Sequence, residues 1–286
     1  MSNKKQRFSG RAPILVALGI LLSRISGLIR ESLLRGALGL GPAADAFAAA
    51  IRIPNLLQNL LGEGSLSAAF IPVYSKLLGQ GRQEEAGRVA GAVASFLTVL
   101  AGGLTIVGIL AARPITRLLA PGFEGTRFDL TVELVRITTA GTGFLVLAAW
   151  CLGVLNSHRR FFLSYVAPVL WNGAQIAVLG AAIFSSWEAA EAARALAWGL
   201  VAGGVLQLGF QVLGVARLRT GVRLSADWKL PTVLEVFRRF VPAVIGRGVL
   251  QLSAYLDLVL ASLLATGALA GLMSAQALYV LPVSLF

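Results

Sequence analysis

Charged side chains are scarce in this sequence. Asp, Glu, Lys and Arg together make up 13% of its 286 residues, about half of the fraction found in soluble globular domains. The mean hydropathy is +0.79. A surface with so little charge is poorly suited to water. The composition therefore excludes an ordinary soluble domain and favours a chain whose outer face meets lipid.

Residues that build metal clusters and disulfide frameworks are almost missing. The chain has one cysteine, Cys151, inside an apolar run, and one histidine, His158, in a predicted loop. One of each is too few for a disulfide framework or a cysteine–histidine zinc site. The acids within the apolar runs are single and scattered, whereas membrane enzymes that act on polyprenyl phosphates usually need paired acids with Mg²⁺. We therefore expect a protein that is not an enzyme.

Long apolar runs separated by short polar segments are abundant, which is the pattern of successive membrane-spanning helices. Period-two alternation, the signature of strands, never persists. We predict an all-α, polytopic integral membrane protein with about eight transmembrane helices. The last run is still apolar at Phe286, so we expect a truncated last helix and a larger functional unit. The predicted segments are 12–38, 43–78 (interrupted near Gly62-Glu63-Gly64), 84–111, an amphipathic piece at 113–120, 128–156, 162–185, 190–216, 239–265 and a segment from 268 onward.

Basic residues are unevenly distributed, and the net charge is +12. In a soluble chain this charge would suggest nucleic acid. Here most Lys and Arg near the helix ends fall in the N-terminal tail and in the loops on its side of the membrane, as the positive-inside rule describes. We predict no nucleic-acid partner and a cytoplasmic N-terminus. The predicted parts are a basic cytoplasmic tail (1–11), a first transmembrane lobe (12–216), a cytoplasmic linker (217–238) and the incomplete start of a second lobe (239–286).

The first predicted helix carries charges within its apolar sequence. Arg24 lies roughly 20 Å along the helix from Arg11, near the middle of a hydrocarbon core about 30 Å thick. Each such charge costs roughly 2.5–3.5 kcal/mol, so Arg24 and Arg30 need water, partners or a ligand. Arg24 and Glu31 share one face, and Arg30 lies about a third of a turn away. These side chains would line a wide cavity that suits phosphate or carboxylate.

The second predicted helix repeats this pattern. Asp45, Arg52 and Asn59 are spaced by seven residues, and Asn55 follows Arg52 by three, so the four form a polar stripe down one face. Pro54 removes a backbone donor beside Arg52, which frees a carbonyl and permits a bend. Two adjacent helices that both turn arginines inward indicate a solvated cationic cavity.

Structural roles compete with binding roles for several of these residues. The arginines could instead form ion pairs with Glu31, Asp45 or Glu63. Asn172 and Gln207 are more often helix–helix hydrogen-bond partners than ligands, and Trp171 is expected to be an interfacial or packing residue. Asp257 is an isolated acid deep in the segment 239–265, too far from Arg247 for a direct pair. It therefore needs a cation, a proton or a basic residue beyond this sequence as its partner.

Strings of residues along nearly the whole sequence occur in a recognisable order. They are SRISGLIRE at 23–31, DAF at 45–47, RIPNLL at 52–57, EG at 63–64, FIPV at 70–73, APGF at 120–123, LNS at 155–157 and APVLWN at 167–172. In these strings the sequence resembles the MurJ (MviN) family of lipid II flippases, in the multidrug/oligosaccharidyl-lipid/polysaccharide exporter superfamily. The resemblance implies a polytopic transporter of fourteen helices, with two lobes around a central cationic cavity.

The resemblance also implies a substrate and a place. The expected substrate is lipid II, the undecaprenyl-pyrophosphate-linked peptidoglycan precursor, which the protein would flip across the bacterial inner membrane by alternating access. We expect a monomer surrounded by membrane lipids. Asp257 resembles a sodium ligand, so Na⁺ would be the coupling ion, and no other cofactor is expected. The residues expected to bind substrate are Ser23, Arg24, Arg30, Glu31, Asn55 and Asn172 by resemblance, and Arg52 from the charge pattern.

Two positions depart from the family pattern. Many members carry arginine after Leu57, where this chain has Gln58-Asn59, and the usual Ala-Asp-Arg-Leu string is Ala275-Gln276-Ala277-Leu278. We hypothesise that Arg52 or Arg247 compensates for the missing arginines. The alternatives are an exporter of another polyprenyl-linked glycan, a cation-coupled drug exporter, which fits an arginine-rich cavity poorly, and a non-transporting membrane scaffold.

Overall fold

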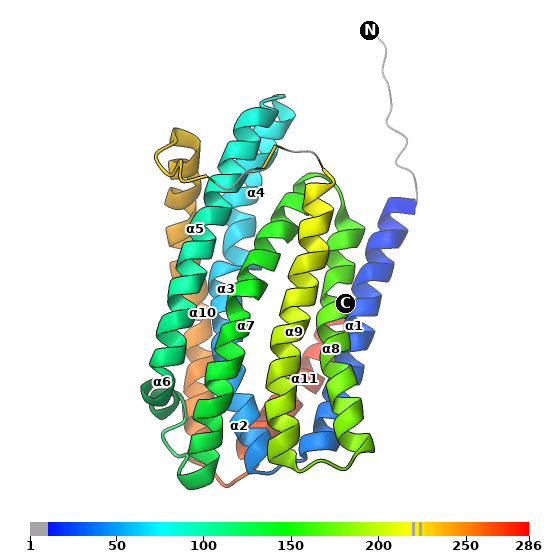
Figure 1. Cartoon of the computed structure of the whole chain (residues 1–286), viewed down its shortest axis with the longest axis vertical. Helices are drawn as coiled ribbons and strands as arrows, with labels where there is room; N and C mark the ends of the chain where they lie inside the picture. The colour runs from blue at the N-terminus through cyan, green and yellow to red at the C-terminus, as the bar shows by residue number, and fades with distance from the viewer. Residues whose placement is uncertain (1–10, 219–220, 223–224, 286) are drawn as a thin grey trace.

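The computed structural model describes the backbone of residues 11–218, 221–222 and 225–285, and the side chains of these except 11–16, 63 and 277–285. Its long helices run side by side as a bundle (Figure 1). The helices are α1 (Arg11–Leu38), α2 (Pro42–Ala50), α3 (Arg52–Leu61), α4 (Glu63–Gly79), α5 (Gln83–Leu110), α6 (Ala112–Leu119), α7 (Gly125–Ser157), α8 (Phe161–Phe184), α9 (Ala189–Ala216), α10 (Pro231–Ser262) and α11 (Ala268–Leu285). The described residues contain no strand, so the all-α prediction is confirmed.

Among the residues that the structure describes, five helices are long and apolar enough to cross a membrane, namely α5, α7, α8, α9 and α10. Their compositions match the predicted spans, and the chain is a polytopic membrane protein. α1 is equally long but carries Arg24, Arg30 and Glu31. The predicted total of eight spans and the division into two lobes stay predictions.

The segment predicted as one interrupted helix at 43–78 is three helices, α2, α3 and α4. The break at Gly62 lies where the glycines predicted it. The other break, at Ile51, follows from Pro54, which has no N–H to donate to the carbonyl of Ala50. The hydroxyl of Thr138 on α7 donates to that carbonyl instead, at 3.2 Å. The bend predicted beside Arg52 is therefore present, and α7 satisfies the freed carbonyl.

The start of α10 was predicted too late. The helix begins at Pro231 instead of residue 239, so part of the predicted linker is helical. The basic residues Arg238 and Arg239 suggested a loop, but they lie on the outer side of an amphipathic turn. Its inner side buries Val233 and Val236. Proline at the first helical position suits this start, because its missing donor would have no partner there.

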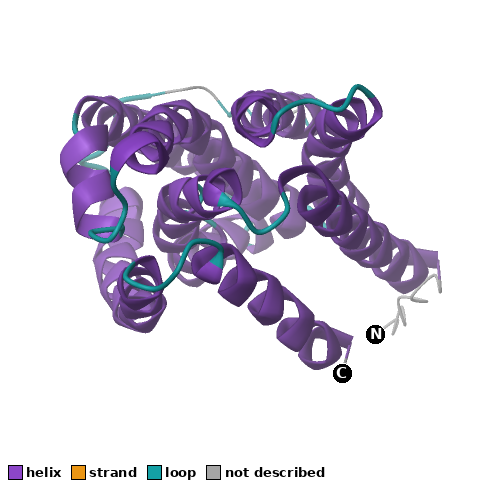
Figure 2. Cartoon of the chain, turned by 90° about the horizontal axis from the view of Figure 1, so that it is seen from below, coloured by secondary structure: helices purple, strands orange, loops and turns teal. Residues whose placement is uncertain are grey.

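Two hydrophobic clusters hold the bundle together. One lies at the end where α2 meets α6, the start of α7 and the start of α11. The other lies at the opposite end, between α4, α5, the end of α7 and the start of α10. Seen along the bundle, α11 diverges from the other helices (Figure 2).

Candidate functional site

A pocket of about 590 Å³ lies between α1 and α8, which we call the α1–α8 pocket. Five predicted site residues border it. The polar side chains that line it are Ser23, Arg24, Arg30 and Glu31 of α1, Gln58 of α3, Ser164, Tyr165, Trp171 and Asn172 of α8, and Gln207 of α9. The spacing along α1 brings its polar residues to one side, as the helical periodicity predicted.

Asn172 ties α8 to α1 as well as lining this pocket. Its side-chain N–H₂ donates to Ser26 Oγ at 2.9 Å and to the carbonyl of Ser23 at 3.4 Å. Asn172 is 6% exposed. Asn172 therefore forms hydrogen bonds between α8 and α1 and also borders the pocket.

Arg30 is held by an aromatic ring and a carboxylate. Its guanidinium carbon lies 5.0 Å from the centroid of the Trp171 ring, and Nη2 lies 3.8 Å from Glu31 Oε2. Glu31 is shared with Arg35, whose Nη2 is 3.6 Å from its other oxygen. One carboxylate therefore faces two guanidinium groups, and the positive charge exceeds the negative charge at this point.

The alternative prediction, that Arg24, Arg30 and Arg52 form ion pairs with nearby acids, holds among the described side chains for Arg30 only. Arg24 is exposed to the pocket and forms no ion pair with the described side chains. Arg52 Nη2 donates to Gln276 Oε1 at 3.4 Å. The side chain of Glu63 lies outside the described part of the structure. Of the three arginines, only Arg30 has a carboxylate within 4 Å among the described residues, and that contact is long.

Asp45 does not continue the polar stripe of Arg52, Asn55 and Asn59. The break at Ile51 separates it from them, and it is 1% exposed. Its carboxylate accepts hydrogen bonds from the backbone N–H groups of Gly267 at 2.7 Å and Ala270 at 2.9 Å. Arg127 Nη1 lies 3.4 Å from the same carboxylate. Asp45 therefore joins α2 to the start of α11, where the helix dipole favours negative charge.

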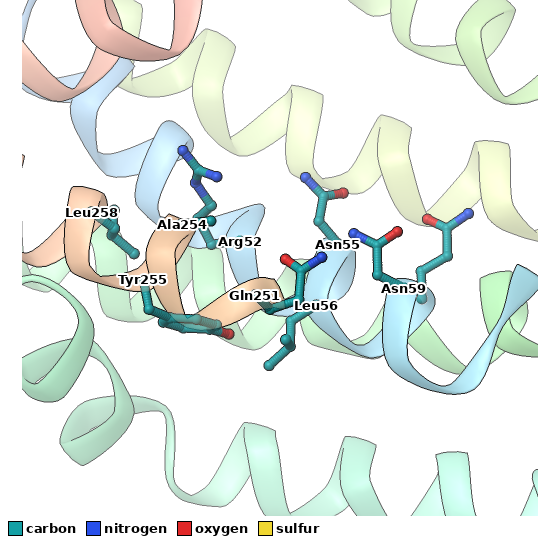
Figure 3. A pocket seen from close by; sticks show the side chains of 9 residues that line it. Arg52, Asn55, Leu56, Asn59, Gln251, Ala254, Tyr255 and Leu258 are labelled. Carbon is teal, nitrogen blue, oxygen red and sulfur yellow. The ribbon is translucent and has the colours of Figure 1, made fainter. Parts of the chain in front are cut away.

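A second pocket, of about 280 Å³, lies between α3 and α10 and is called the α3–α10 pocket (Figure 3). The predicted site residues Arg52 and Asn55 border it. Its other lining residues are Leu56, Gln58, Asn59, Gln251, Ala254, Tyr255 and Leu258. A cavity of about 290 Å³, lined by Arg30, Asn55, Gln58 and Trp171 among others, lies between the two pockets. Gln58 borders all three spaces.

Asp257 is half-buried on α10. No arginine or lysine among the described side chains forms an ion pair with it within 4 Å. No cluster of three or more His, Cys, Asp or Glu side chains occurs among the described residues. The role of Asp257 as a sodium ligand stays a prediction.

Several pocket residues were not predicted. Trp171 was expected to be an interfacial or packing residue, yet it borders the α1–α8 pocket and supports Arg30. Gln251 and Tyr255 were not singled out. With Arg247 they stand four residues apart on α10, a polar stripe that could have revealed them. Arg247 itself packs its guanidinium against Gly64 of α4 and borders neither pocket.

Comparison with known proteins identifies the family. The family model described as "Lipid II flippase MurJ" matches residues 35–286. The chain belongs to the MurJ family. It is 36% identical over 263 residues to "Probable lipid II flippase MurJ" of Rhizobium tropici, covering 91% of this chain and 49% of that protein. It is 34% identical over 281 residues to "Lipid II flippase MurJ" of Burkholderia cenocepacia, covering 96% and 54%.

Solved structures support the same fold. "Lipid II flippase MurJ, inward closed conformation" superposes with a TM-score of 0.77 at 24% identity, over 96% of this chain and 56% of that one. A MATE transporter in complex with MaD3S gives a TM-score of 0.69 at 18% identity, over 85% and 55%. This MurJ-family chain spans about half of the length of the relatives it matches. Substrate binding by the predicted site residues stays a prediction.

Proposed function

We propose that the protein is a flippase that moves lipid II across the bacterial inner membrane, with Arg24 and Arg30 binding the pyrophosphate. The observation that carries this proposal is the α1–α8 pocket, where the two guanidinium groups border a space of about 590 Å³. Guanidinium groups bind phosphate oxygens in pairs. The relatives that the chain matches are named for this substrate.

Transport rather than chemistry fits the side chains. The pocket offers cations, amides and aromatic groups, but Glu31 is its single acid. A Mg²⁺-dependent reaction on phosphates usually uses more than one acid. Binding followed by release on the other side needs no bond to break.

Alternating access is part of the proposal. α2 and α7 belong to the predicted first lobe and α11 to the second, and the buried Asp45 joins them at one end of the bundle. Breaking this contact would open that end, while the opposite end closes.

The orientation in the membrane is also proposed. The tail of residues 1–10 lies outside the described part of the structure. The start of α1, the end of α4, the loop between α7 and α8 and the end of α9 lie at one end of the bundle (Figure 1). These segments carry Lys76, Arg160 and Arg217, so the positive-inside rule favours a cytoplasmic N-terminus. A reporter fused at Trp187, in the loop between α8 and α9, should report an external position. A cytoplasmic signal there would reverse the orientation.

The test is replacement of Arg24 and Arg30 by alanine, singly and together, in the full-length protein. Growth of a flippase-depleted strain should be lost, and purified protein should no longer bind polyprenyl pyrophosphate. The matched control is Arg88→Ala on α5, an exposed arginine that borders neither pocket, and it should support growth. Normal growth of the double variant at equal membrane levels would refute the proposal.

Two alternative functions make different predictions. An exporter of another polyprenyl-linked glycan would need the same arginines but would not rescue a strain that lacks lipid II flippase. A non-transporting scaffold would keep its activity when both arginines are removed. The excess of positive charge around Glu31 favours an anionic substrate and therefore a transporter.

A further inference from the structure

The α3–α10 pocket is bordered mainly by groups that form hydrogen bonds without carrying charge. Four of its nine lining residues are carboxamides, those of Asn55, Gln58 and Asn59 on α3 and Gln251 on α10. Each carboxamide offers an N–H₂ donor and a carbonyl acceptor. The α1–α8 pocket differs from it in having two guanidinium groups, those of Arg24 and Arg30, and one carboxylate, that of Glu31.

Helical spacing places these groups on facing sides of two helices. Arg52, Asn55 and Asn59 stand at i, i+3 and i+7 along α3, and Gln251 and Tyr255 stand at i and i+4 along α10. All five residues line the pocket between the two helices, and Figure 3 shows the side chains of Asn55, Asn59 and Gln251 extending in the same direction. The arrangement therefore comes from the fold and does not depend on a loop.

The carboxamides are free to bind a ligand. No hydrogen bond between described residues uses the side chains of Asn55, Gln58, Asn59 or Gln251, although Arg52 bonds to Gln276. Asn55 and Asn59 are exposed, and Gln58 and Gln251 are half-buried. None of their polar atoms is among the fully buried, unpartnered atoms. Their donors and acceptors therefore reach the open space of the pocket.

Resting on the flippase function proposed above, we infer that the α3–α10 pocket is a subsite for an uncharged sugar of the lipid-linked substrate. Sugar hydroxyl groups both donate and accept hydrogen bonds, as carboxamides do, so the two surfaces can satisfy each other. The ring of Tyr255 offers an apolar face for the C–H groups of the sugar, and its hydroxyl offers one more polar contact.

The position of the pocket suits one ligand that occupies both sites. Gln58 borders the α1–α8 pocket, the α3–α10 pocket and the cavity between them. A pyrophosphate at Arg24 and Arg30 would therefore have its attached sugar near Gln58, with Gln251 beyond. The charged and neutral parts of a single headgroup would meet the side chains that suit each of them.

The experiment compares two probes on the full-length protein in lipid nanodiscs: undecaprenyl pyrophosphate, and the same lipid carrying a disaccharide. Asn59→Leu and Gln251→Met keep the side-chain size and remove the amide. The wild type should bind the disaccharide lipid more tightly. Each replacement should weaken that binding on the order of 5-fold, and both together more, because each removes about one hydrogen bond. Binding of the sugar-free lipid should stay within about twofold.

The control is Gln80→Met at the exposed end of α4, which should change neither affinity. Equal loss for both lipids, or no loss for either, would overturn the sugar subsite. So would equal affinity of the wild type for the two lipids, although the proposed function would then stand. A wild type that binds neither lipid would overturn both. Arg30→Gln separates the two sites, because it should weaken both lipids.

Discussion

The guanidinium of Arg30 lies 5.0 Å from the centre of the Trp171 ring, so an aromatic residue of α8 fixes a charge carried by α1. Trp171 is itself held by α9. Gly203 allows this approach, since a Cβ there would lie 2.8 Å from the Trp171 carbonyl oxygen. The indole Nε1 is buried and has no partner among the described residues. The ring face, rather than the N–H group, therefore makes the contact with Arg30.

Replacing Trp171 should show how much the ring contributes. Trp171→Leu should weaken binding of polyprenyl pyrophosphate by roughly 2- to 30-fold, because a cation–π contact contributes about 0.5–2 kcal/mol. Trp171→Phe keeps an aromatic face and should lose less. Trp198→Leu, at a ring that is 60% exposed on α9, is the control and should bind normally. Equal loss for Phe and Leu would contradict a role for the ring face.

The Asp45 contact predicts a local opening. Asp45→Ala would leave the N–H groups of Gly267 and Ala270 without their acceptor and Arg127 without its carboxylate, at a cost of about 3–5 kcal/mol. A cysteine introduced at the buried Leu269 should then react several-fold faster with a maleimide. The measurement uses a Cys151→Ala background, so that the native thiol cannot contribute.

Asp129→Ala is the matched control for Asp45→Ala. Asp129 pairs with Arg113 at 3.3 Å, and both side chains are mostly exposed, so that pair contributes about 0–1 kcal/mol. The cysteine at Leu269 should stay unreactive in this variant. Unchanged labelling in Asp45→Ala would mean that the apolar cluster alone keeps this end closed.

The hydrogen bond between Asn172 and Ser26 should couple α8 to α1. A double-mutant cycle with Asn172→Leu and Ser26→Ala would measure this coupling in the free energy of unfolding. We expect an interaction of about 1 kcal/mol, typical of a buried hydrogen bond. Additive effects of the two replacements would show that the 2.9 Å contact does not stabilise the bundle.

Much of the fold could be predicted because lipid imposes long apolar helices. The predicted segments at 84–111, 162–185 and 190–216 match α5, α8 and α9 closely. The prediction failed where a residue far away in the sequence determines the point at which a helix begins or ends. The break at Ile51 is completed by Thr138 of α7, and the early start of α10 depends on Val233 and Val236 finding an apolar cluster. Local sequence contains neither partner.

In the candidate site, too, residues on one helix could be predicted together, whereas contacts between helices could not. Ser23, Arg24 and Arg30 could be grouped because one helix carries them all. Asp45 could not be separated from Arg52 by spacing alone, since the break at Ile51 ends the helical register between them. The direction in which Trp171 faces depends on how α8 packs between α1 and α9. The helical period within α8 does not predict that packing.

The stability of the folded protein should depend on the protonation of its single histidine, His158. His158 ends α7, and its Nε2 lies 2.9 Å from the hydroxyl of the buried Tyr74. Burial, and to a smaller extent the charge of Arg160, lowers the pKa of His158 below its usual value of 6.5. The unfolded chain therefore takes up this proton at a higher pH than the folded protein does. The contribution of the neutral His158 imidazole to the free energy of unfolding is complete above about pH 6.5. It is lost as the pH falls towards the lowered pKa.

His158→Gln tests this sign, because an amide can keep the bond to Tyr74 but does not titrate. The midpoint of thermal unfolding of the wild type should fall more between pH 7.5 and 5.5 than that of the variant. Carboxylates of ordinary pKa titrate below this window, so the difference in slope belongs to the imidazole. Tyr74→Phe removes the bond but leaves the imidazole buried beside Arg160, and should keep the wild-type slope. Parallel slopes for the wild type and His158→Gln would mean that the imidazole is hydrated well enough to titrate as it does in the unfolded chain.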